Sequence, residues 1–453
     1  MYKKIKGVHF VGIGGSGMSG IAEVLLNLGY KVSGSDMKMT AVTERLKKIG
    51  GSIICEHRAE NISGAEVVVY SSAVKWDNPE IVEAHRQRIP VVPRAEMLAE
   101  LMRLKYGIAV GGTHGKTTTT SLIASVIAAG GLDPTVVIGG RLNSLGAGAK
   151  LGTGKFMIVE ADESDGSFLK LSPVIVVVTN IDREHMDHYG EFANLRDSFL
   201  DFINKVPFYG LAVLCGDHPV IRGLFPFVMR RFVTYGFSNG NFITGRNLNL
   251  NNNISEFDVV ADNTTLCRIR LKIPGRHNVQ NALAAVSVGM ELDVPVSAIK
   301  NALEGFEGIE RRFQIRGEKK GIIVVDDYGH HPEEIRATIR VAKECWKKRL
   351  ILIFQPHRYT RTQDLREEFF TCFDGADYMI LSEIYPGGED PLPGVTSDLI
   401  WSGIKDRTKG EYIQDKKLIS DAVLKVCMPG DMILTMGAGD IWTVGEEILR
   451  RLE

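Results

Sequence analysis

The residues best suited to chemistry lie in "AVGGTHGKTTTT", residues 109–120, where a glycine-rich turn leads to Lys116. In such a turn backbone N–H groups cradle phosphates, the lysine neutralises the β- and γ-oxygens, and the hydroxyl of a residue such as Thr117 binds Mg²⁺. The strict G-x-x-x-x-G-K-[ST] pattern has a glycine where this chain has Val110, so the match is imperfect. We predict an ATP site here, rather than an ordinary strand-to-helix turn. Its phosphate-binding residues would be Gly112, Thr113, His114, Gly115, Lys116, Thr117 and Thr118.

Two groups of acidic and histidine side chains follow, in "MIVEADESDGSF" and "VVVTNIDREHMDHYG". Each group ends a buried strand, and parallel strands present side chains from their carboxyl ends at one edge of a sheet. We expect both groups to face the Lys116 loop and to hold magnesium, with Glu160 as the first ligand and His185 beside a second metal. For the other carboxylates and His188, a helix N-cap or a solvated turn is an equally good interpretation.

A second glycine loop, "FVGIGGSGMSG", occupies residues 10–20. Gly12, Gly14 and Gly17 have the spacing of a dinucleotide-binding turn, and Asp36 follows at the offset of a ribose partner. The loop predicts a bound diphosphate, with a purely structural turn as the alternative. It does not say which chemistry the protein performs.

A third polar group, in "IPGRHNVQNALAAVSVG", stands at the head of an alanine-rich helix. Arg276, His277, Asn278 and Asn281 are suited to hydrogen-bonding and stacking on an adenine, and equally to capping the helix. Taken alone, these residues favour the cap.

The elements that must position these residues are short β-branched runs alternating with helical patterns, which is typical of α/β folds with mostly parallel, doubly wound sheets. The runs fall into three groups, and residues 236–274, rich in Asn and Gly, read as hairpins added to the second group. We therefore expect three α/β domains, the central one a P-loop ATPase with an antiparallel addition. The expected boundaries are 1–105, 106–312 and 313–453.

Composition narrows the class of partner. The chain has 453 residues, 54 Lys plus Arg against 55 Asp plus Glu and a formal net charge of −1, so no global field attracts nucleic acid or an anionic membrane. Six scattered cysteines without a C-x-x-C pair argue against a thiolate metal site or a disulfide framework and favour a reducing cytoplasm. No apolar run is long enough to span a bilayer. Small-molecule partners, no nucleic acid and no membrane insertion are expected.

Taken together and in order, eight motifs resemble the Mur ligase family along nearly the whole chain. They are "HFVGIGGSGMSGIAEVL", "GTHGKTTTTS", "VEADESD", "TNIDREHMDHY", "GRHNVQNALAA", "ERRF", "DDYGHHPEEI" and "QPHRYTR". The resemblance implies an N-terminal domain for a UDP-sugar, a central ATPase and a C-terminal domain that brings in the amino acid and closes over ATP. It also implies that the first glycine loop holds the diphosphate of the UDP-sugar, since an oxidoreductase has no use for the ATP site.

Within the family, the resemblance is to members that join L-alanine to UDP-N-acetylmuramate, using ATP and Mg²⁺, as a monomer or weak homodimer. The implied reaction makes an acyl phosphate from the lactyl carboxylate, then a tetrahedral intermediate with the alanine amine, releasing ADP and phosphate.

The resemblance also implies roles for individual residues. Thr117 and Glu160 would hold the first magnesium and His185 the second, and the catalytic group would be Lys116, Glu160, His185, His330 and Arg358. ATP would further contact His277, Asn278, Asn281 and Asp327. The substrates would contact Gly12, Gly14, Gly15, Gly17, Met18, Arg94, Arg311, Tyr328, His330, His357, Arg358 and Arg361. Taken singly, His330 and His331 are equally readable as turn residues before Pro332.

Three alternatives stay open. A paralogue joining a recycled muropeptide to the same UDP-sugar shares the sugar and ATP motifs, although Gly329, two residues after Asp327, follows the alanine-adding pattern. A nicotinamide oxidoreductase is disfavoured by the Lys116 loop. A non-catalytic P-loop switch is disfavoured by the Arg and His residues of the third domain.

The last prediction concerns the second metal. Some relatives support it with a carbamylated lysine beyond the "EHMD" histidine, but here that helical position reads Phe199, Leu200, Asp201, and the next lysine, Lys205, lies about a turn too far along. We expect activity to be unchanged in carbon-dioxide-depleted buffer and native mass analysis to find no carbamate. A carbamate on Lys205, or activity restored by bicarbonate, would contradict this.

Overall fold

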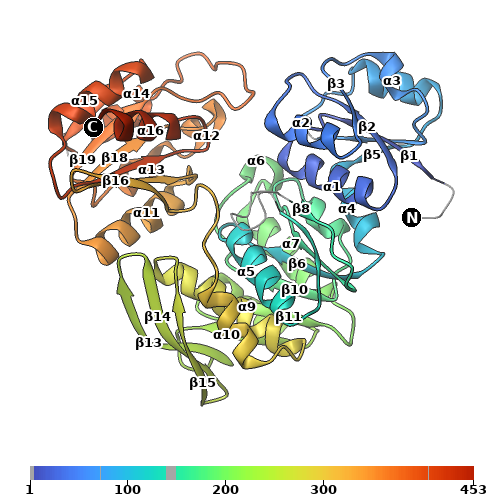
Figure 1. Cartoon of the computed structure of the whole chain (residues 1–453), viewed down its shortest axis with the longest axis horizontal. Helices are drawn as coiled ribbons and strands as arrows, with labels where there is room; N and C mark the ends of the chain where they lie inside the picture. Colours follow the sequence, from blue (N-terminus) through green and yellow to red (C-terminus); the bar gives the residue numbers. More distant parts are fainter. Residues whose placement is uncertain (1–4, 72, 139–148, 407, 453) are drawn as a thin grey trace. The chain divides into compact units, whose positions relative to one another are not determined.

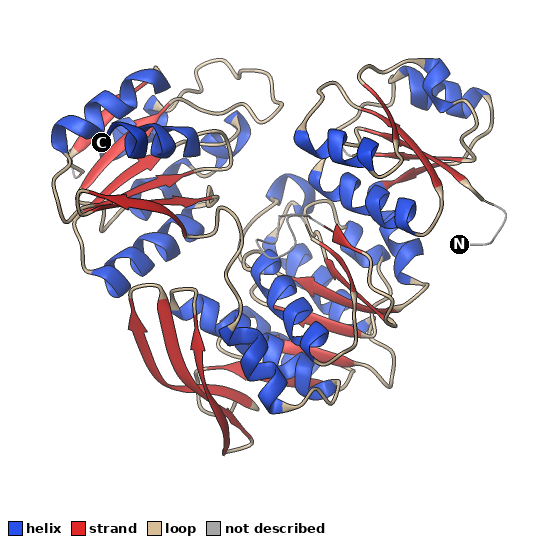
Figure 2. Ribbon diagram, in the orientation of Figure 1, coloured by secondary structure: helices blue, strands red, loops and turns tan. Residues whose placement is uncertain are grey.

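The chain folds around three separate β-sheets, each flanked by helices, as Figures 1 and 2 show. The computed structural model describes residues 5–71, 73–138, 149–406 and 408–452. All three sheets are mostly parallel, so the predicted three-domain α/β fold class is confirmed. Among the described residues, no helix has both the length and the apolar character that crossing a bilayer requires.

The first sheet has five parallel strands in the order β3-β2-β1-β4-β5. Its order reverses between β1 and β4, and in open α/β sheets ligands bind at the carboxyl ends of strands at such a switch point; the first glycine loop directly follows β1. The strands are β1 (Gly7–Val11), β2 (Lys31–Ser35), β3 (Ser52–Ile54), β4 (Val67–Tyr70) and β5 (Val91–Pro93). The helices are α1 (Ser16–Asn27), α2 (Ala41–Lys48), α3 (Pro79–Arg86) and α4 (Arg94–Met102).

The second sheet has ten strands in the order β15-β14-β13-β12-β11-β10-β6-β9-β7-β8. Its central strand β6 is buried, apart from its first residue, and pairs in parallel with β9 on one side and β10 on the other. The strands are β6 (Tyr106–Gly111), β7 (Thr135–Val137), β8 (Ala149–Lys150), β9 (Phe156–Glu160), β10 (Ile175–Val178), β11 (Leu211–Cys215), β12 (Phe232–Gly236), β13 (Ile243–Asn251), β14 (Ile254–Ala261) and β15 (Thr264–Leu271). The helices are α5 (Lys116–Ala129), α6 (Met186–Tyr189), α7 (Phe192–Asn204), α8 (Pro219–Leu224), α9 (Arg276–Glu291) and α10 (Val296–Glu304).

Strands β13, β14 and β15 form the hairpins expected from the Asn- and Gly-rich segment (Figure 1). Asp262 and Asn263, the two residues between β14 and β15, both have positive φ, of 43° and 62°. Two consecutive positive φ angles define the tight turn that matches the twist of antiparallel strands, and Asp and Asn tolerate this conformation.

The third sheet has six strands in the order β16-β17-β21-β18-β19-β20, with only β16 antiparallel to its neighbour. The strands are β16 (Gln314–Lys319), β17 (Ile322–Asp327), β18 (Leu350–Phe354), β19 (Tyr378–Ser382), β20 (Gly410–Ile413) and β21 (Met432–Met436). The helices are α11 (Pro332–Val341), α12 (Tyr359–Asp364), α13 (Arg366–Cys372), α14 (Asp398–Ile404), α15 (Ile419–Val426) and α16 (Trp442–Arg451). Because β17, β21 and β18 are adjacent and parallel, the loops after them emerge together.

Contacts within the chain define two compact units. The first contains the first sheet, most of the second sheet and α9 from Asn278 onward. The second contains residues 307–453 with the short stretches 249–256 and 271–277. The three domain ranges expected from the sequence, 1–105, 106–312 and 313–453, stay a prediction.

Candidate nucleotide and amino-acid sites

The loop between β6 and α5 is held in place by the residues after β10. The backbone N–H of His114 donates to the Asn180 side chain at 2.7 Å, and the Thr179 hydroxyl donates to the carbonyl of His114 at 2.6 Å. Gly112 has φ 133°, and a Cβ there would lie 2.1 Å from the Thr179 hydroxyl oxygen, so only glycine fits. The predicted phosphate turn is therefore held by hydrogen bonds to the residues after β10.

Lys116, the first residue of α5, points back into this loop. Its ammonium donates to the carbonyls of Gly112 at 2.6 Å and Thr113 at 3.1 Å, and to Glu163 Oε1 at 2.8 Å. Burial alone would lower the pKa of Lys116, but Glu163, Glu184 and Asp162 reverse this and raise it. Lys116 therefore carries its positive charge where the phosphates are expected.

Glu163, Glu184 and His185 form the cluster best suited to a metal ion. One ligand atom from each lies within 4.8 Å of the others, and His185 Nε2 is 4.0 Å from both Glu163 Oε1 and Glu184 Oε2. Burial raises the pKa of Glu163 to about 7, although Lys116 opposes the shift. Two carboxylates and one imidazole supply oxygen and nitrogen donors that suit a divalent cation.

Glu160, the expected first ligand, is the last residue of β9 and is not one of these three. Glu163 lies three residues further along, and its backbone carbonyl accepts a hydrogen bond from the Tyr189 hydroxyl at 2.5 Å. The acidic run offered several candidate carboxylates, and the strand's end did not show which of them turns toward Lys116. Sequence reasoning did not single out Glu163 and Glu184 among the acidic residues, and the metal role of Glu160 stays a prediction.

Phe199 is the first of the three residues, Phe199, Leu200 and Asp201, at which the carbamylated lysine of some relatives is expected to fall. It is fully buried, and its ring packs against Phe168, whose ring also contacts Phe202 with centroids 4.8 Å apart. This position belongs to the hydrophobic core.

The backbone of the first glycine loop hydrogen-bonds to Asp36, the acidic residue after β2. Gly14 N–H donates to Asp36 Oδ2 at 2.8 Å, and Lys38 N–H donates to Asp36 Oδ1 at 3.2 Å. Gly12, with φ 80°, donates to the carbonyl of Ser35 at 2.9 Å. Asp36 therefore helps to fix the turn, and the ribose contact that its offset suggests stays a prediction.

Arg94 links this loop to the acidic run after β9. Its guanidinium donates to Asp162 Oδ2 at 2.8 Å, and a Cβ on Gly17 would lie 2.9 Å from Arg94 Nη1. Burial alone would raise the pKa of Asp162, but Arg94 and hydrogen bonds from Ser164 lower it. Met18, the next residue, is buried in α1.

The polar residues at the start of α9 divide between two environments. Asn281 donates to Asn278 at 3.3 Å, and a Cβ on Gly115 would lie 2.9 Å from Asn281 Oδ1, so these two amides border the phosphate loop. Burial, with Arg312 and Arg340, lowers the pKa of His277 to about 4. His277 is therefore neutral and belongs to the second unit with those arginines.

Asp327 and Arg311 are both engaged within the third sheet. Asp327 accepts hydrogen bonds from the N–H groups of Phe313 at 2.8 Å and Gly329 at 2.7 Å, and burial raises its pKa to about 6. Arg311 donates to Asp326 at 2.9 Å and to the carbonyls after β21. Their ATP and substrate roles stay predictions.

The loops after β17 and β18 bring the remaining predicted residues together. The rings of His330 and His357 lie 5.5 Å apart, Tyr328 lies 5.7 Å from His330, and Arg361 Nη1 lies 3.2 Å from His357 Nδ1. Burial, helped by His330, Arg361 and Arg358, lowers the pKa of His357 to about 3, so its ring is neutral.

Two neighbours of this group have structural roles. His331 is the N-cap of α11, and its side chain accepts a hydrogen bond from the Glu333 N–H. At Gly329 a Cβ would lie 2.4 Å from the Met436 methyl carbon and 2.8 Å from Asp327 Oδ1, so a side chain there would require these groups to shift.

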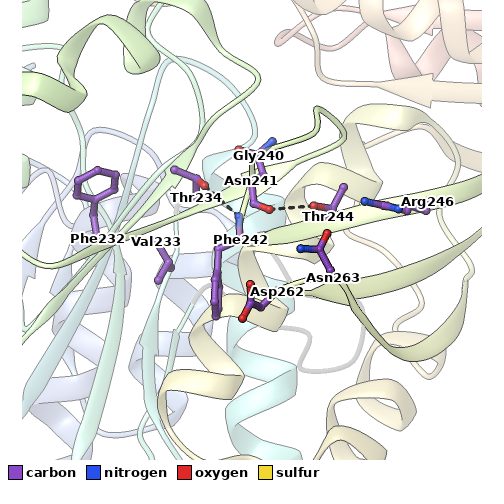
Figure 3. A pocket seen from close by; sticks show the side chains of 10 residues that line it. All are labelled: Phe232, Val233, Thr234, Gly240, Asn241, Phe242, Thr244, Arg246, Asp262 and Asn263. Carbon is purple, nitrogen blue, oxygen red and sulfur yellow. Dashed lines mark hydrogen bonds between the residues drawn. The ribbon is translucent and has the colours of Figure 1, made fainter.

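A separate hollow of about 350 Å³ lies beside β12 and β13 (Figure 3). Its lining includes Thr234, Phe242 and Arg246 but none of the predicted site residues. The Phe242 N–H donates to the Thr234 hydroxyl at 3.1 Å, so its polar groups partly satisfy one another.

Comparison with known proteins gives consistent matches along the chain. Three domain profiles match: "Mur ligase family, catalytic domain" at 7–106, "Mur ligase middle domain" at 110–289 and "Mur ligase, glutamate ligase domain" at 311–439. Proteins named UDP-N-acetylmuramate–L-alanine ligase from Geotalea uraniireducens and Geobacter sulfurreducens are each 54% identical, covering 100% of this chain and 99% of theirs.

Solved structures agree. A UDP-N-acetylmuramate–alanine ligase from Thermotoga maritima is 31% identical, with 98% of each chain covered and a TM-score of 0.82. A murein peptide ligase from Psychrobacter arcticus, 22% identical with a TM-score of 0.74, covers 99% of this chain and 98% of its own, and shares the fold.

The geometry predicts different outcomes for the two glutamates. Glu163→Gln should lower kcat by about a hundredfold or more, because it removes a charge beside Lys116, whereas Glu160→Gln should cost less than about tenfold. Steady-state phosphate release measures kcat for each variant, and equal thermal unfolding midpoints show that the variants are folded to the same extent. A larger loss of kcat in Glu160→Gln than in Glu163→Gln would indicate that Glu160, at the end of β9, is the metal ligand.

Proposed function

Because the chain belongs to the Mur ligase family, we propose that it joins L-alanine to the lactyl carboxylate of UDP-N-acetylmuramate, with ATP converted to ADP and phosphate. The product is a precursor of peptidoglycan. The observation that carries this proposal is full-length identity of 54% to proteins named for this reaction. The intact Lys116 loop and the arginine and histidine group after β18 support it.

The chemical difficulty is that a carboxylate is a poor electrophile. In the proposed reaction a lactyl oxygen attacks the γ-phosphorus of ATP, the bond to the bridging oxygen breaks, and an acyl phosphate and ADP form. The alanine amine then attacks the carbonyl carbon, giving a tetrahedral intermediate. Phosphate leaves with the bonding electron pair, and the amine nitrogen loses its proton.

The chain's contribution to the first step is positioning and electrostatic stabilisation. The glycine turn presents N–H groups to the phosphates, and Lys116 balances charge on the transferring group. In place of the expected set of Thr117, Glu160 and His185, we propose that Glu163, Glu184 and His185, with the Thr117 hydroxyl, hold Mg²⁺. The ion would supply further positive charge along the phosphate chain.

The amino acid is proposed to bind beside α12. The Arg358 and Arg361 guanidinium groups suit a carboxylate, since arginine offers a planar fork of donors. Neutral His357 accepts a hydrogen bond from Arg361, which fixes the orientation of that guanidinium. His330 lies against His357 and is proposed to face the amine side.

We also propose a cytoplasmic location. All six cysteines are free, as a reducing compartment favours.

The test is phosphate release with UDP-N-acetylmuramate and ATP, assayed across the twenty amino acids and with the muropeptide. Release that requires both the sugar and L-alanine, with the amide product identified by mass, supports the proposal. Release with the muropeptide and not with alanine would assign the paralogous reaction, and release without the sugar would indicate a simple ATPase.

Lys116→Ala should lower kcat by on the order of a hundredfold or more while leaving the Kd for UDP-N-acetylmuramate unchanged. The reason is that Lys116 contacts the β6–α5 loop and Glu163, whereas the sugar loop follows β1. Calorimetric binding alongside turnover checks both halves. Lost sugar affinity with a preserved ATPase rate would overturn this assignment of the loops.

Arg358→Ala should raise the KM for L-alanine by about tenfold or more, because a charge-assisted carboxylate contact is lost, and should change the KM for ATP far less. Varying each substrate in turn at saturating levels of the others measures this. Unchanged alanine kinetics would place the amino-acid site elsewhere.

A further inference from the structure

The backbone at Arg358 is held in a conformation that side-chain-bearing residues rarely adopt. Arg358 precedes α12 with φ 73° and ψ 141°. Such a conformation is costly for a non-glycine residue and persists only where surrounding contacts fix it. The residue proposed to bind the amino-acid carboxylate therefore depends on whatever holds this corner.

What holds it is the segment after β19, residues 384–389, which we call the 384–389 strap. Tyr385 N–H donates to the carbonyl of Pro356 at 2.8 Å, and Arg358 N–H donates to the carbonyl of Tyr385 at 2.9 Å. Residues His357 and Tyr385 thus pair as a short parallel bridge. Further along, Glu389 accepts hydrogen bonds from the N–H of Thr360 at 3.1 Å and from its hydroxyl at 2.6 Å. The strap is fastened on both sides of Arg358.

The side chains of the strap also set the His357 ring. The Tyr385 ring stacks on it, with centroids 5.8 Å apart and planes at 11°. Because arginine only donates, the 3.2 Å contact from Arg361 Nη1 makes His357 Nδ1 an acceptor and places the proton of the neutral ring on Nε2. The stack therefore fixes the ring plane that orients Arg361.

Gly387 sets the limit on the other side of the ring. It has φ 60°, and a Cβ there would lie 2.8 Å from His357 Nε2, 3.0 Å from His357 Cε1 and 3.1 Å from Arg358 Cγ. All three atoms belong to residues of the proposed amino-acid site. The neighbouring Gly388 has φ 91°, and a Cβ there would meet nothing within 4 Å. Any side chain at 387 displaces the carboxylate-binding corner, whereas one at 388 projects into open space.

We propose that Tyr385 and Gly387 are positioning residues for the amino-acid substrate: the strap that they belong to holds His357, Arg358 and Arg361 in the arrangement that binds the carboxylate. This inference rests on the proposed function of those three residues. On this view, the affinity for the amino acid also depends on Tyr385 and Gly387, which lie on the loop after β19 and are not among the site residues predicted from the sequence.

The matched pair Gly387→Ala and Gly388→Ala tests the proposal in the full chain. Both changes add one methyl group at a positive-φ glycine, and the control has the more strained backbone. Gly387→Ala should raise the KM for L-alanine by about tenfold, with the KM values for ATP and UDP-N-acetylmuramate within about twofold of the unaltered protein. Gly388→Ala should leave all three within about twofold. Equal alanine KM values in the two variants would overturn the proposal.

A second pair covers the case in which an alanine at 387 prevents folding. Tyr385→Phe keeps the stacked ring and the backbone hydrogen bonds, so alanine kinetics should stay unchanged, whereas Tyr385→Ala should raise the alanine KM without changing the other two. A general structural role would lower kcat and raise every KM together in Tyr385→Ala, and that result would overturn the proposal.

The failure of this inference is distinguishable from failure of the proposed function. If the unaltered protein forms the alanine amide and Arg358→Ala raises the alanine KM, but the strap variants match their controls, the strap alone is wrong. If Arg358→Ala has no effect on alanine, the amino-acid site itself lies elsewhere.

Discussion

The common direction of the strands is the constraint on which every proposed site depends. Parallel strands deliver their carboxyl ends to one edge of a sheet, and a loop after one strand can then meet loops after its neighbours. In the second sheet β6 lies between β9 and β10, so the Lys116 turn meets Glu163 from one side and His185 from the other. In the third sheet the same rule groups His330, His357 and the turn after β21.

Lys116 and Glu163 form a buried ion pair in which each charge compensates the cost of burying the other. Both side chains are largely removed from water, and burying a charge is costly unless an opposite charge compensates. The carboxylate keeps the lysine charged, and the lysine opposes the protonation that burial favours in Glu163. A site built in this way maintains strong local charge, at the expense of stability, for ligands that bring their own phosphates.

The sequence predicted those features that depend on local rules. A Gly-Lys-Thr turn after an apolar strand, the meeting of two acidic strand ends and the Asn-Gly hairpins are all consequences of backbone geometry. It did not predict which carboxylate of the acidic run pairs with Lys116, because Glu160 and Glu163 differ only in how the chain leaves β9. Nor did it predict that Asp36 hydrogen-bonds to the glycine loop itself, since a ribose contact and a loop contact require the same residue at the same spacing.

The histidines also divide into roles that follow from neighbouring residues in the sequence and roles that follow from contacts between distant segments. His331 precedes a proline and caps α11, a local role, whereas the neutral state of His357 arises from burial and from His330, Arg361 and Arg358 around it. Tyr385 and Gly387 carry no motif at all, and their proximity to His357 follows only from the pairing of β18 with β19.

The contact of Arg94 with both Gly17 and Asp162 has a consequence for protein engineering. Arg94 packs against the first turn of α1 and pairs with a carboxylate one residue before Glu163. The two loops proposed to hold nucleotides therefore share one arginine, which must fit Gly17 in the first loop and Asp162 in the run after β9. A chimaera that grafts residues 1–105 from a relative onto this chain would need a compatible residue at 162. A chimaera joined at the expected boundary, after residue 105, without such a residue would leave the charge at position 94 or 162 unpaired next to the proposed phosphate site.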